Sequence, residues 1–456
     1  MIIGLDVGTT TVTGVAWDAG AGRVRQVARR RNDAARPRLP ATRAEEDPNR
    51  LLALSREVLA ELAAAGAGGP PEGIALTGQK HGLLCVDARG EALTPLISWQ
   101  DRRTSEPGDD PSGRTALEMA REAVAGLDWR PNGCRIQHGY GAATLFWLVR
   151  RGALPDAADW ACTAAGWVAA RLTGGRPATD PTFAASWGIY DLVRGSWSEA
   201  FVDRLGLPAR LLPPVRPAGE ALGGLSGEAA RATGLPAGLP VFNPVGDTQA
   251  SFLGSVPDPE GTVLVNLGTG GQVCWAVPAF EPPGERVETR PLPGSGALRV
   301  GASLCGGAAY AWLNRTLRAW LAEFGLEAGE EAVYRRLNAL AASTPDTGGL
   351  QVRTTFLGVR GDPSVRGGAI EDITVDNMAL GALARATLVG LVDELRDLYG
   401  EAGPGGGGAR VVAAGGVVER NLLLLEIVGQ RFGLPVEPAA HREAAAVGAA
   451  LLAARR

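Results

Sequence analysis

The feature that most constrains this chain is a glycine-turn hairpin pattern that occurs twice. Residues 2–17 read as an apolar run ending at Asp6, a Gly-Thr-Thr turn and a second alternating apolar run. This pattern is typical of a β-hairpin, and its glycine lets the backbone approach a ligand closely. Residues 263–275 repeat the pattern with a Gly-Thr-Gly-Gly turn. The repeat predicts two related domains that face each other across one nucleotide.

The first turn carries groups that suit phosphate and a metal ion. The N–H and O–H groups of Thr9 and Thr10 can donate hydrogen bonds to phosphate oxygens. Asp6 is the candidate to hold Mg²⁺ through water, because Mg²⁺ prefers oxygen ligands and keeps several waters. An ordinary hairpin is the alternative interpretation of this stretch taken alone. The chain has no G-x-x-x-x-G-K-[ST] motif, which excludes a P-loop.

Length and composition narrow the class of protein. A chain of 456 residues is too long for one core, so two domains are expected. The net charge of −4 argues against a nucleic-acid partner. No apolar run approaches a membrane span and the first residues do not resemble a signal peptide, so no membrane partner is expected. Five scattered cysteines without a C-x-x-C pair favour reduced thiols in the cytoplasm.

Alternating strands and helices predict a mixed α/β fold. Asp47-Pro48 is expected to cap and start a helix. An apolar strand over residues 239–245 ends at Gly246-Asp247, and we place the domain boundary there, with domains at 1–245 and 246–456. Residues 179–190 and 287–293 read as loops, and residues 403–408 as a glycine-rich linker.

Two polar clusters are candidates for an acceptor site. Gln79, Lys80 and His81 follow a short buried strand, and ligands bind at the carboxyl ends of strands in α/β sheets. The second cluster offers an apolar wall for sugar C–H faces, and an amide and a carboxylate for vicinal hydroxyls. It consists of Trp99, Gln100 and Asp101. A well-bonded turn and a solvated charge cluster are the respective alternatives.

Asp247 is the candidate catalytic base. It follows a buried strand and begins a helix at the domain junction. A carboxylate there can accept the proton of an attacking hydroxyl. A helix N-cap without catalytic function is the alternative interpretation.

An ordered set of motifs carries a resemblance to a known family. The set is LDVGTT, TGQKHG, WQDRR, GDTQASFLGS, NLGTGG, GGAAYAWL and AAGGVVERN. The two phosphate loops resemble those of the actin/hexokinase/Hsp70-type, ribonuclease-H-like fold. The whole order resembles the FGGY carbohydrate kinases, and GYGAATLFW, AASWG, GDTQASFLGS and GASLCGGAAYAW are most similar to their sedoheptulokinase branch.

The resemblance implies ATP and Mg²⁺ in a cleft between two such domains, and a role for each candidate residue. Asp6 would position Mg²⁺, Gly415 and Gly416 would pass under the adenosine, and Asn421 would approach the base. The residues implied around the phosphates are Gly8, Thr9, Thr10, Gly268 and Thr269, with Gly307 in the same nucleotide site. Those implied at the sugar are Gln79, Lys80, His81, Trp99, Gln100, Asp101 and Asp247. A homodimer is one option for assembly.

Lys80 departs from the family pattern, which usually has methionine at this position. Of the 45 lysine and arginine residues of the chain, only Lys80 is a lysine. A lysine presents a compact, rotatable ammonium, whereas an arginine imposes a planar fork. We therefore expect Lys80 to border the acceptor pocket, where it can donate to hydroxyls or attract a carboxylate. Chance is the alternative.

The resulting expectation is an ATP-dependent kinase that phosphorylates a primary hydroxyl of a ketose, with sedoheptulose converted to sedoheptulose 7-phosphate as the first choice. Xylulose, ribulose, a polyol or a sugar acid are alternative acceptors. A nucleotide-gated actin-fold protein without kinase activity is the rival class, but it has no need of WQDRR together with GDTQ.

Overall fold

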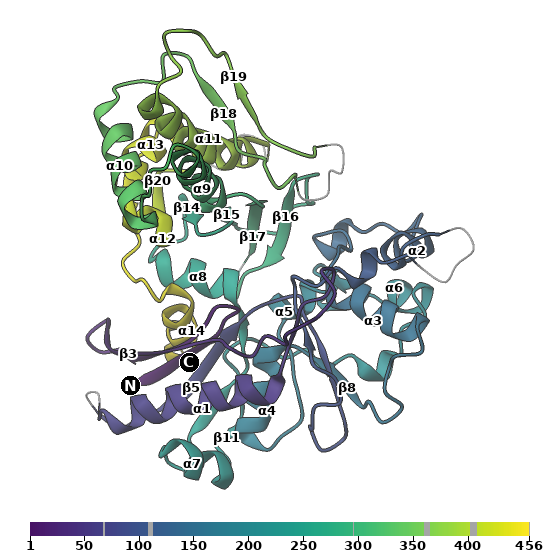
Figure 1. Cartoon of the computed structure of the whole chain (residues 1–456). Helices are drawn as coiled ribbons and strands as arrows, with labels where there is room; N and C mark the ends of the chain where they lie inside the picture. The colour runs from purple at the N-terminus through teal and green to yellow at the C-terminus, as the bar shows by residue number, and fades with distance from the viewer. Residues whose placement is uncertain (67–68, 108–112, 295, 360–364, 402–407, 456) are drawn as a thin grey trace.

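A computed structural model shows two lobes, each built around one mixed β-sheet (Figure 1). It describes residues 1–66, 69–107, 113–294, 296–359, 365–401 and 408–455. The first lobe contains the sheet with the N-terminal hairpin, and the second lobe contains the sheet with the repeated hairpin. The observed fold agrees with the expected pair of ribonuclease-H-like domains.

The sheet of the first lobe begins with the hairpin predicted from residues 2–17. β1 (Ile2–Val7) pairs antiparallel with β2 (Thr11–Asp18) and parallel with β5 (Gly73–Gly78). The order across the sheet is β11 (Ala221–Gly224), β12 (Pro240–Phe242), β5, β1, β2 and β3 (Arg23–Arg31), with β13 (Val245–Gly246) beside β5. Asp47 caps α1 (Pro48–Ala64) through the Asn49 N–H, as its sequence predicts.

The sheet of the second lobe repeats this arrangement. β14 (Thr262–Leu267) pairs antiparallel with β15 (Gly271–Val277) and parallel with β20 (Arg410–Ala414). The order is β16 (Val287–Pro291), β17 (Ala297–Ser303), β15, β14, β20 and β21 (Val436–Pro438). The predicted internal repeat is therefore confirmed by topology, and Asp6 and Asn266 are the penultimate residues of β1 and β14.

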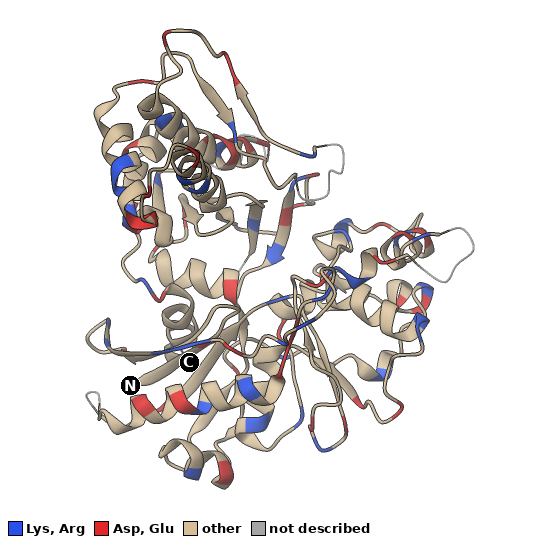
Figure 2. Ribbon diagram, in the orientation of Figure 1, with Lys and Arg blue, Asp and Glu red and all other residues tan. Residues whose placement is uncertain are grey.

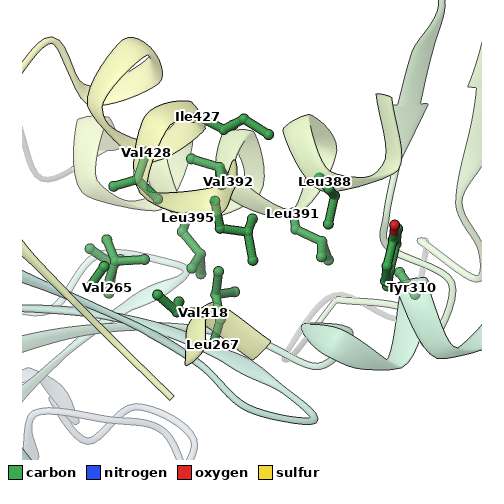
Figure 3. Packing of buried hydrophobic residues seen from close by; sticks show 14 of the residues in the cluster. Val265, Leu267, Tyr310, Leu388, Leu391, Val392, Leu395, Val418, Ile427 and Val428 are labelled. Carbon is green, nitrogen blue, oxygen red and sulfur yellow. The ribbon is translucent and has the colours of Figure 1, made fainter. Parts of the chain in front are cut away.

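Each sheet packs helices on both faces. Buried residues of α1, α4 (Ala164–Thr173) and α7 (Gly227–Thr233) share a core with the first sheet. Figure 3 shows the corresponding core of the second lobe, where α11 (Leu380–Glu401) and α13 (Leu423–Phe432) bury Leu391, Leu395 and Ile427 against the sheet.

Two helices lie between the sheets (Figure 1). α8 (Asp247–Ser255) packs Phe252 on the second sheet, and α14 (Ala444–Ala454) packs on the first. They touch closely, since a Cβ on Gly254 would lie 2.0 Å from the Ala444 oxygen and one on Gly448 would lie 1.8 Å from the Ala250 oxygen. The C-terminal helix therefore packs on the first lobe, although it belongs to the second predicted domain.

A smaller, mostly helical part extends the first lobe and carries its own apolar core. Its helices are α2 (Ala116–Ala123), α3 (Gly141–Arg150), α5 (Pro181–Ala185) and α6 (Glu199–Arg204). The short strands of the first lobe are β4 (Glu45–Glu46), β6 (Leu84–Val86), β7 (Leu96–Ile97), β8 (Trp160–Cys162), β9 (Tyr190–Asp191) and β10 (Ser196–Trp197). The remaining elements of the second lobe are α9 (Gly307–Glu323), α10 (Glu330–Ser343), β18 (Gln351–Arg353), β19 (Ala369–Glu371) and α12 (Gly416–Arg420).

Several expectations for individual segments are wrong. Residues 287–293 are not simply a loop, because β16 pairs with β17 along its whole length. Residues 179–190 contain α5, which Asp180 caps by accepting from the Phe183 N–H. The strand expected at 239–245 is broken into β12 and β13. The linker expected at 403–408 is not tested, because it lies almost wholly outside the described residues.

No helix in the described ranges is long and apolar enough to cross a membrane.

Candidate active site

The first phosphate loop is held by main-chain contacts and by one asparagine. The Gly8 N–H donates to the Thr11 carbonyl at 3.1 Å, and the Asn32 side chain donates to the Gly8 carbonyl at 3.0 Å. A Cβ on Gly8 would lie 2.8 Å from the Thr11 oxygen, so a larger residue would distort the turn. Thr10 is exposed at its tip. The loop is therefore preformed, with a hydroxyl open to a ligand.

The second phosphate loop is tied to the beginning of α9. The N–H groups of Gly307 and Ala308 donate to the carbonyls of Gly268 and Thr269 at 2.8 and 3.1 Å. A Cβ on Gly307 would lie 2.5 Å from Val417, so α12 approaches the same point. The structure thus brings Gly268, Thr269 and Gly307 together, as expected, and leaves Thr269 exposed.

The candidate adenosine side is built around α12. Gly415 has a φ of 98°, and a Cβ there would lie 2.4 Å from the Leu267 oxygen, so glycine is required. A Cβ on Gly416 would meet no atom within 4 Å, which leaves space above it. Asn421 is buried and donates to Asn338 Oδ1 at 3.1 Å. Asn421 therefore holds the neighbouring side chain in place at the edge of this space.

The ends of the two equivalent strands line one cavity between the lobes. This cavity has a volume of about 350 Å³, and its lining includes Asp6, Asn266 and Gly415. It is bounded on its other side by α12 and by residues 438–446, which lead into α14.

A hydrogen-bonded chain links the first phosphate loop to both acceptor motifs. The Trp99 indole N–H donates to Thr9 Oγ1 at 2.9 Å, and that hydroxyl lies 3.4 Å from Gln79 Oε1. The Gln79 amide in turn donates to both oxygens of Glu46, at 3.1 and 3.0 Å. Burial raises the pKa of Glu46. Thr9 therefore joins the candidate nucleotide side to the candidate acceptor side.

His81 is fixed in a strained backbone conformation, with a φ of 71°. Its N–H donates to Ser186 Oγ at 3.1 Å, and its ring Nδ1 lies 2.7 Å from the Ser186 carbonyl. The ring stacks on Tyr140, with centroids 4.2 Å apart and an angle of 17° between planes. Such over-determined strain is common at ligand sites. His81 and Tyr140 thus form one flat wall.

Lys80 is buried and reaches Asp247. Its Nζ atom lies 3.7 Å from Asp247 Oδ1, whose side chain is 41% exposed. The stem passes under Gly246, where a Cβ would lie 2.7 Å from Lys80 Cδ. Burial lowers the pKa of Lys80, and the carboxylate of Asp247 opposes this shift. The ammonium therefore lies beside the candidate base.

The residues of the second candidate acceptor cluster differ in their exposure. Trp99 is 40% exposed and Gln100 is exposed, so both can meet a ligand. Asp101, in contrast, is 1% exposed and accepts from the Ala44 N–H and from three N–H groups of Arg103. Protein donors occupy both oxygens of Asp101, so this residue holds the loop in place. This differs from the expectation that Asp101 faces the acceptor.

Asp6 has the properties of a carboxylate that is suited to bind a cation. Its Oδ1 atom is buried without a hydrogen-bond partner among the described residues. Burial, and then the nearby charge of Asp247, raise the pKa of Asp6 to about 7. A buried carboxylate oxygen without a hydrogen-bond partner, and the repulsion between the carboxylates of Asp6 and Asp247, fit a bound Mg²⁺ ion.

Comparisons with known proteins identify the family of this chain. The N-terminal domain model of the FGGY family of carbohydrate kinases matches residues 1–254, and the C-terminal domain model matches residues 265–456. The chain belongs to the FGGY family of carbohydrate kinases. Membership makes it an ATP-dependent carbohydrate kinase and sets aside the rival class of non-kinase actin-fold proteins.

The names of proteins similar to this FGGY kinase refer to different acceptors. Human sedoheptulokinase is 30% identical over 436 residues, which cover 90% of this chain and 86% of the relative. Glycerol kinase from Thermus brockianus is 33% identical over 385 residues, which cover 79% and 70%. Xylulose kinase from Rhodospirillum rubrum superposes with a TM-score of 0.87 and 30% identity, covering 99% and 89%.

The sequence patterns did not single out several residues of the candidate site. Glu46, Tyr140 and Ser186 contact predicted residues, yet none was singled out. Tyr140 and Ser186 stand in motifs that carried the family resemblance, GYGAATLFW and AASWG, and that was the available signal. Glu46 had no such signal, since it lies in the two-residue strand β4, far from Gln79 in the chain.

The raised pKa of Asp6 predicts a pH-dependent stability. The unfolded carboxyl ionises near its usual value of 3.8, whereas the folded one keeps its proton until about pH 7. The folded state therefore binds more protons in this window, and its Mg²⁺-free stability falls as pH rises. Asp6→Asn removes this loss and should raise the free energy of unfolding at pH 8 by roughly 1–3 kcal/mol.

Urea unfolding in EDTA at several pH values measures this difference. Asp33→Asn is the matched control, because Arg50 lowers the pKa of the exposed Asp33 and its contribution has the opposite sign. An identical fall in stability for the parent and Asp6→Asn between about pH 4 and pH 7 would contradict the prediction.

Proposed function

We propose that this kinase transfers the γ-phosphoryl group of ATP to a primary hydroxyl of a ketose, with sedoheptulose as the first candidate. The product would be sedoheptulose 7-phosphate. The observation that carries the proposal is the chain Trp99–Thr9–Gln79, which joins the phosphate loop to a wall of acceptor-facing side chains. The human sedoheptulokinase relationship over 90% of this chain supports the choice of sugar.

The acceptor would lie between the exposed indole of Trp99 and the stacked pair of His81 and Tyr140. Flat apolar faces suit the C–H groups of an extended sugar, and polar edges suit its hydroxyls. Gln100 adds an exposed amide to this side. Gln79 is held by Glu46, so its carbonyl keeps a fixed direction toward Thr9. We propose these residues as the acceptor site.

Asp247 would accept the proton of the attacking hydroxyl. Its Oδ1 atom accepts from the Thr248 N–H at 2.7 Å, so the carboxylate has a fixed direction and a partly exposed face. Phosphoryl transfer passes through a loose transition state, in which positioning and charge stabilisation dominate. A carboxylate that is held in a fixed direction is therefore suited to accept the proton late in the transfer.

The nucleotide would lie between the two hairpins. Gly8, Thr9 and Thr10 would face the phosphates from the first lobe, and Gly268, Thr269 and Gly307 from the second. Gly415 and Gly416 would leave room for the adenosine, and Asn421 would border the base. Asp6 would hold Mg²⁺, and the ion would supply positive charge that stabilises the phosphates during transfer. Closure of the lobes over both substrates would exclude water as a competing acceptor.

A panel of acceptors tests the assignment directly. ADP release is measured with sedoheptulose, xylulose, ribulose, glycerol and gluconate at equal concentrations, and kcat/KM is compared. The highest kcat/KM is expected for sedoheptulose. A higher value for any other acceptor would replace sedoheptulose as the assigned acceptor, while the kinase chemistry would stand.

Lys80 provides a second test at the acceptor site. Its ammonium lies beside Asp247, where the reacting hydroxyl must sit. Lys80→Met, which inserts the residue usual in the family, should change the ratio of kcat/KM between acceptors by roughly 1–3 kcal/mol, and the KM for ATP should barely move. Arg56→Met removes a positive charge on α1 and serves as control. An unchanged acceptor ranking with weakened ATP binding would contradict this role.

A further inference from the structure

One strand of the second lobe is docked into the first lobe. The edge strand β16 carries charged residues of both signs where it meets the small helical part (Figure 2). The Thr289 N–H donates to the Gly133 carbonyl at 2.9 Å. Gly133 has a φ of 72°, and a Cβ there would lie 2.0 Å from the Thr289 oxygen. The two main chains therefore touch with no space for a side chain.

Arg290, the next residue of β16, places a buried guanidinium across the contact between the lobes. It is 2% exposed. Its Nη1 donates to the Ala185 carbonyl of α5 at 2.8 Å, and its Nη2 donates to Tyr140 Oη at 3.1 Å and to Glu288 at 2.6 Å. Tyr140 Oη donates to the other oxygen of Glu288 at 2.8 Å. One planar fork thus joins an edge strand of the second lobe to two elements of the first.

Both elements reached by Arg290 lead to the acceptor wall. Tyr140 stacks on His81, and Ala185 directly precedes Ser186, which holds His81 at its N–H and its ring. Any shift of β16 relative to the first lobe must therefore move the partners of His81 or break hydrogen bonds of a buried charge. Breaking such bonds without replacement is costly.

We propose that Arg290 is a positioning residue that couples the acceptor pocket to the second lobe, so that acceptor and ATP bind more tightly together than alone. This inference rests on the proposed function, because it takes the wall of His81 and Tyr140 as the acceptor site. Acceptor bound against the wall stabilises one arrangement of Arg290 and Glu288, and that arrangement sets the second lobe over the nucleotide. Coupling of this kind is reciprocal between the two ligands.

Equilibrium binding measures the coupling. The Kd of a non-hydrolysable ATP analogue with Mg²⁺ is determined without and with saturating sedoheptulose, or the better acceptor from the panel. In the parent enzyme the acceptor should lower the Kd of the analogue by about 5–150-fold, the usual range of coupling between sites. In Arg290→Met the two Kd values should agree within about twofold.

Arg385→Met is the matched control. Arg385 lies on α11 of the second lobe and is also buried, but its hydrogen bonds go to the Ala341 carbonyl and to Glu426 of its own lobe, away from β16. This variant should keep the parental coupling. Equal loss of coupling in both arginine variants would overturn the proposal, because any buried charge would then suffice.

Tyr140→Phe keeps the inference testable if Arg290→Met does not fold. It removes the hydroxyl that bonds Arg290 and Glu288 but retains the ring on His81. Reduced coupling is expected, together with an increased acceptor KM. Parental coupling in Tyr140→Phe, or in folded Arg290→Met, would overturn the proposal.

The same measurements separate this inference from the proposed function. Normal acceptor turnover by the parent, together with an unchanged analogue Kd, would refute the coupling alone. Absence of turnover and of binding for every acceptor of the panel would refute both.

Discussion

Replacing Asp247 with asparagine is expected to lower kcat by about 10²–10⁴-fold, the range for loss of a general base. Asparagine has nearly the same shape, and its carbonyl can still accept from the Thr248 N–H that holds Asp247 at 2.7 Å. It cannot take up the proton of the attacking hydroxyl. The acceptor KM should change far less than kcat, because the lost interaction is made mainly in the transition state.

Steady-state ADP release, with both substrates saturating, provides the measurement. Thr248→Ala is a matched control, since it removes a hydroxyl that contacts Asp247 Oδ1 at 3.3 Å and retains the carboxylate. Turnover of Asp247→Asn within about threefold of the parent would show that another group accepts the proton.

Asp6→Asn is expected to produce the second large effect, a 10–100-fold rise in the Mg²⁺ concentration that supports half-maximal turnover. That range is typical for loss of a carboxylate that orients the water around a metal ion. The physical basis is the unpartnered Oδ1 of Asp6 and the repulsion from Asp247, both of which a divalent cation relieves. The neutral amide removes this attraction for Mg²⁺.

Titration of activity with Mg²⁺ at fixed ATP checks this prediction. The parent should lose all turnover in excess EDTA and regain it on addition of Mg²⁺. Asn266→Ala is an informative control, because Asn266 occupies the equivalent position in the second hairpin but carries no charge. A parental Mg²⁺ requirement in Asp6→Asn would remove Asp6 from the metal site.

Local patterns were sufficient to predict the elements that depend on neighbouring residues in the chain. The hairpins at β1–β2 and β14–β15 follow from alternation and a glycine turn, and the start of α1 follows from Asp47 and Pro48. The order of motifs was enough to predict the family, and with it the two-lobed fold. Asp6 and Asp247 followed from their places at strand ends.

Segments without a local pattern were misread. The sequence of β16 contains charged residues and a proline, which are typical of a loop, and it forms a strand because β17 supplies its partner. Asp101 has the composition of a sugar ligand, but Arg103 and the Ala44 N–H enclose its carboxylate. Arg103 is only two residues after Asp101, and β17 directly follows β16, but these pairings depend on the backbone geometry and not on residue type.

The sequence by itself determined the paired hairpins, the family and the cluster of polar residues after β5, because each of these depends on contiguous residues. Only the tertiary structure decided that Glu46 holds Gln79, that Lys80 reaches Asp247 and that Arg290 bridges the lobes to Tyr140. These contacts join residues far apart in the chain, and only the packing of strands, loops and helices brings them together. Side-chain partners so far apart have no signature in local periodicity or composition.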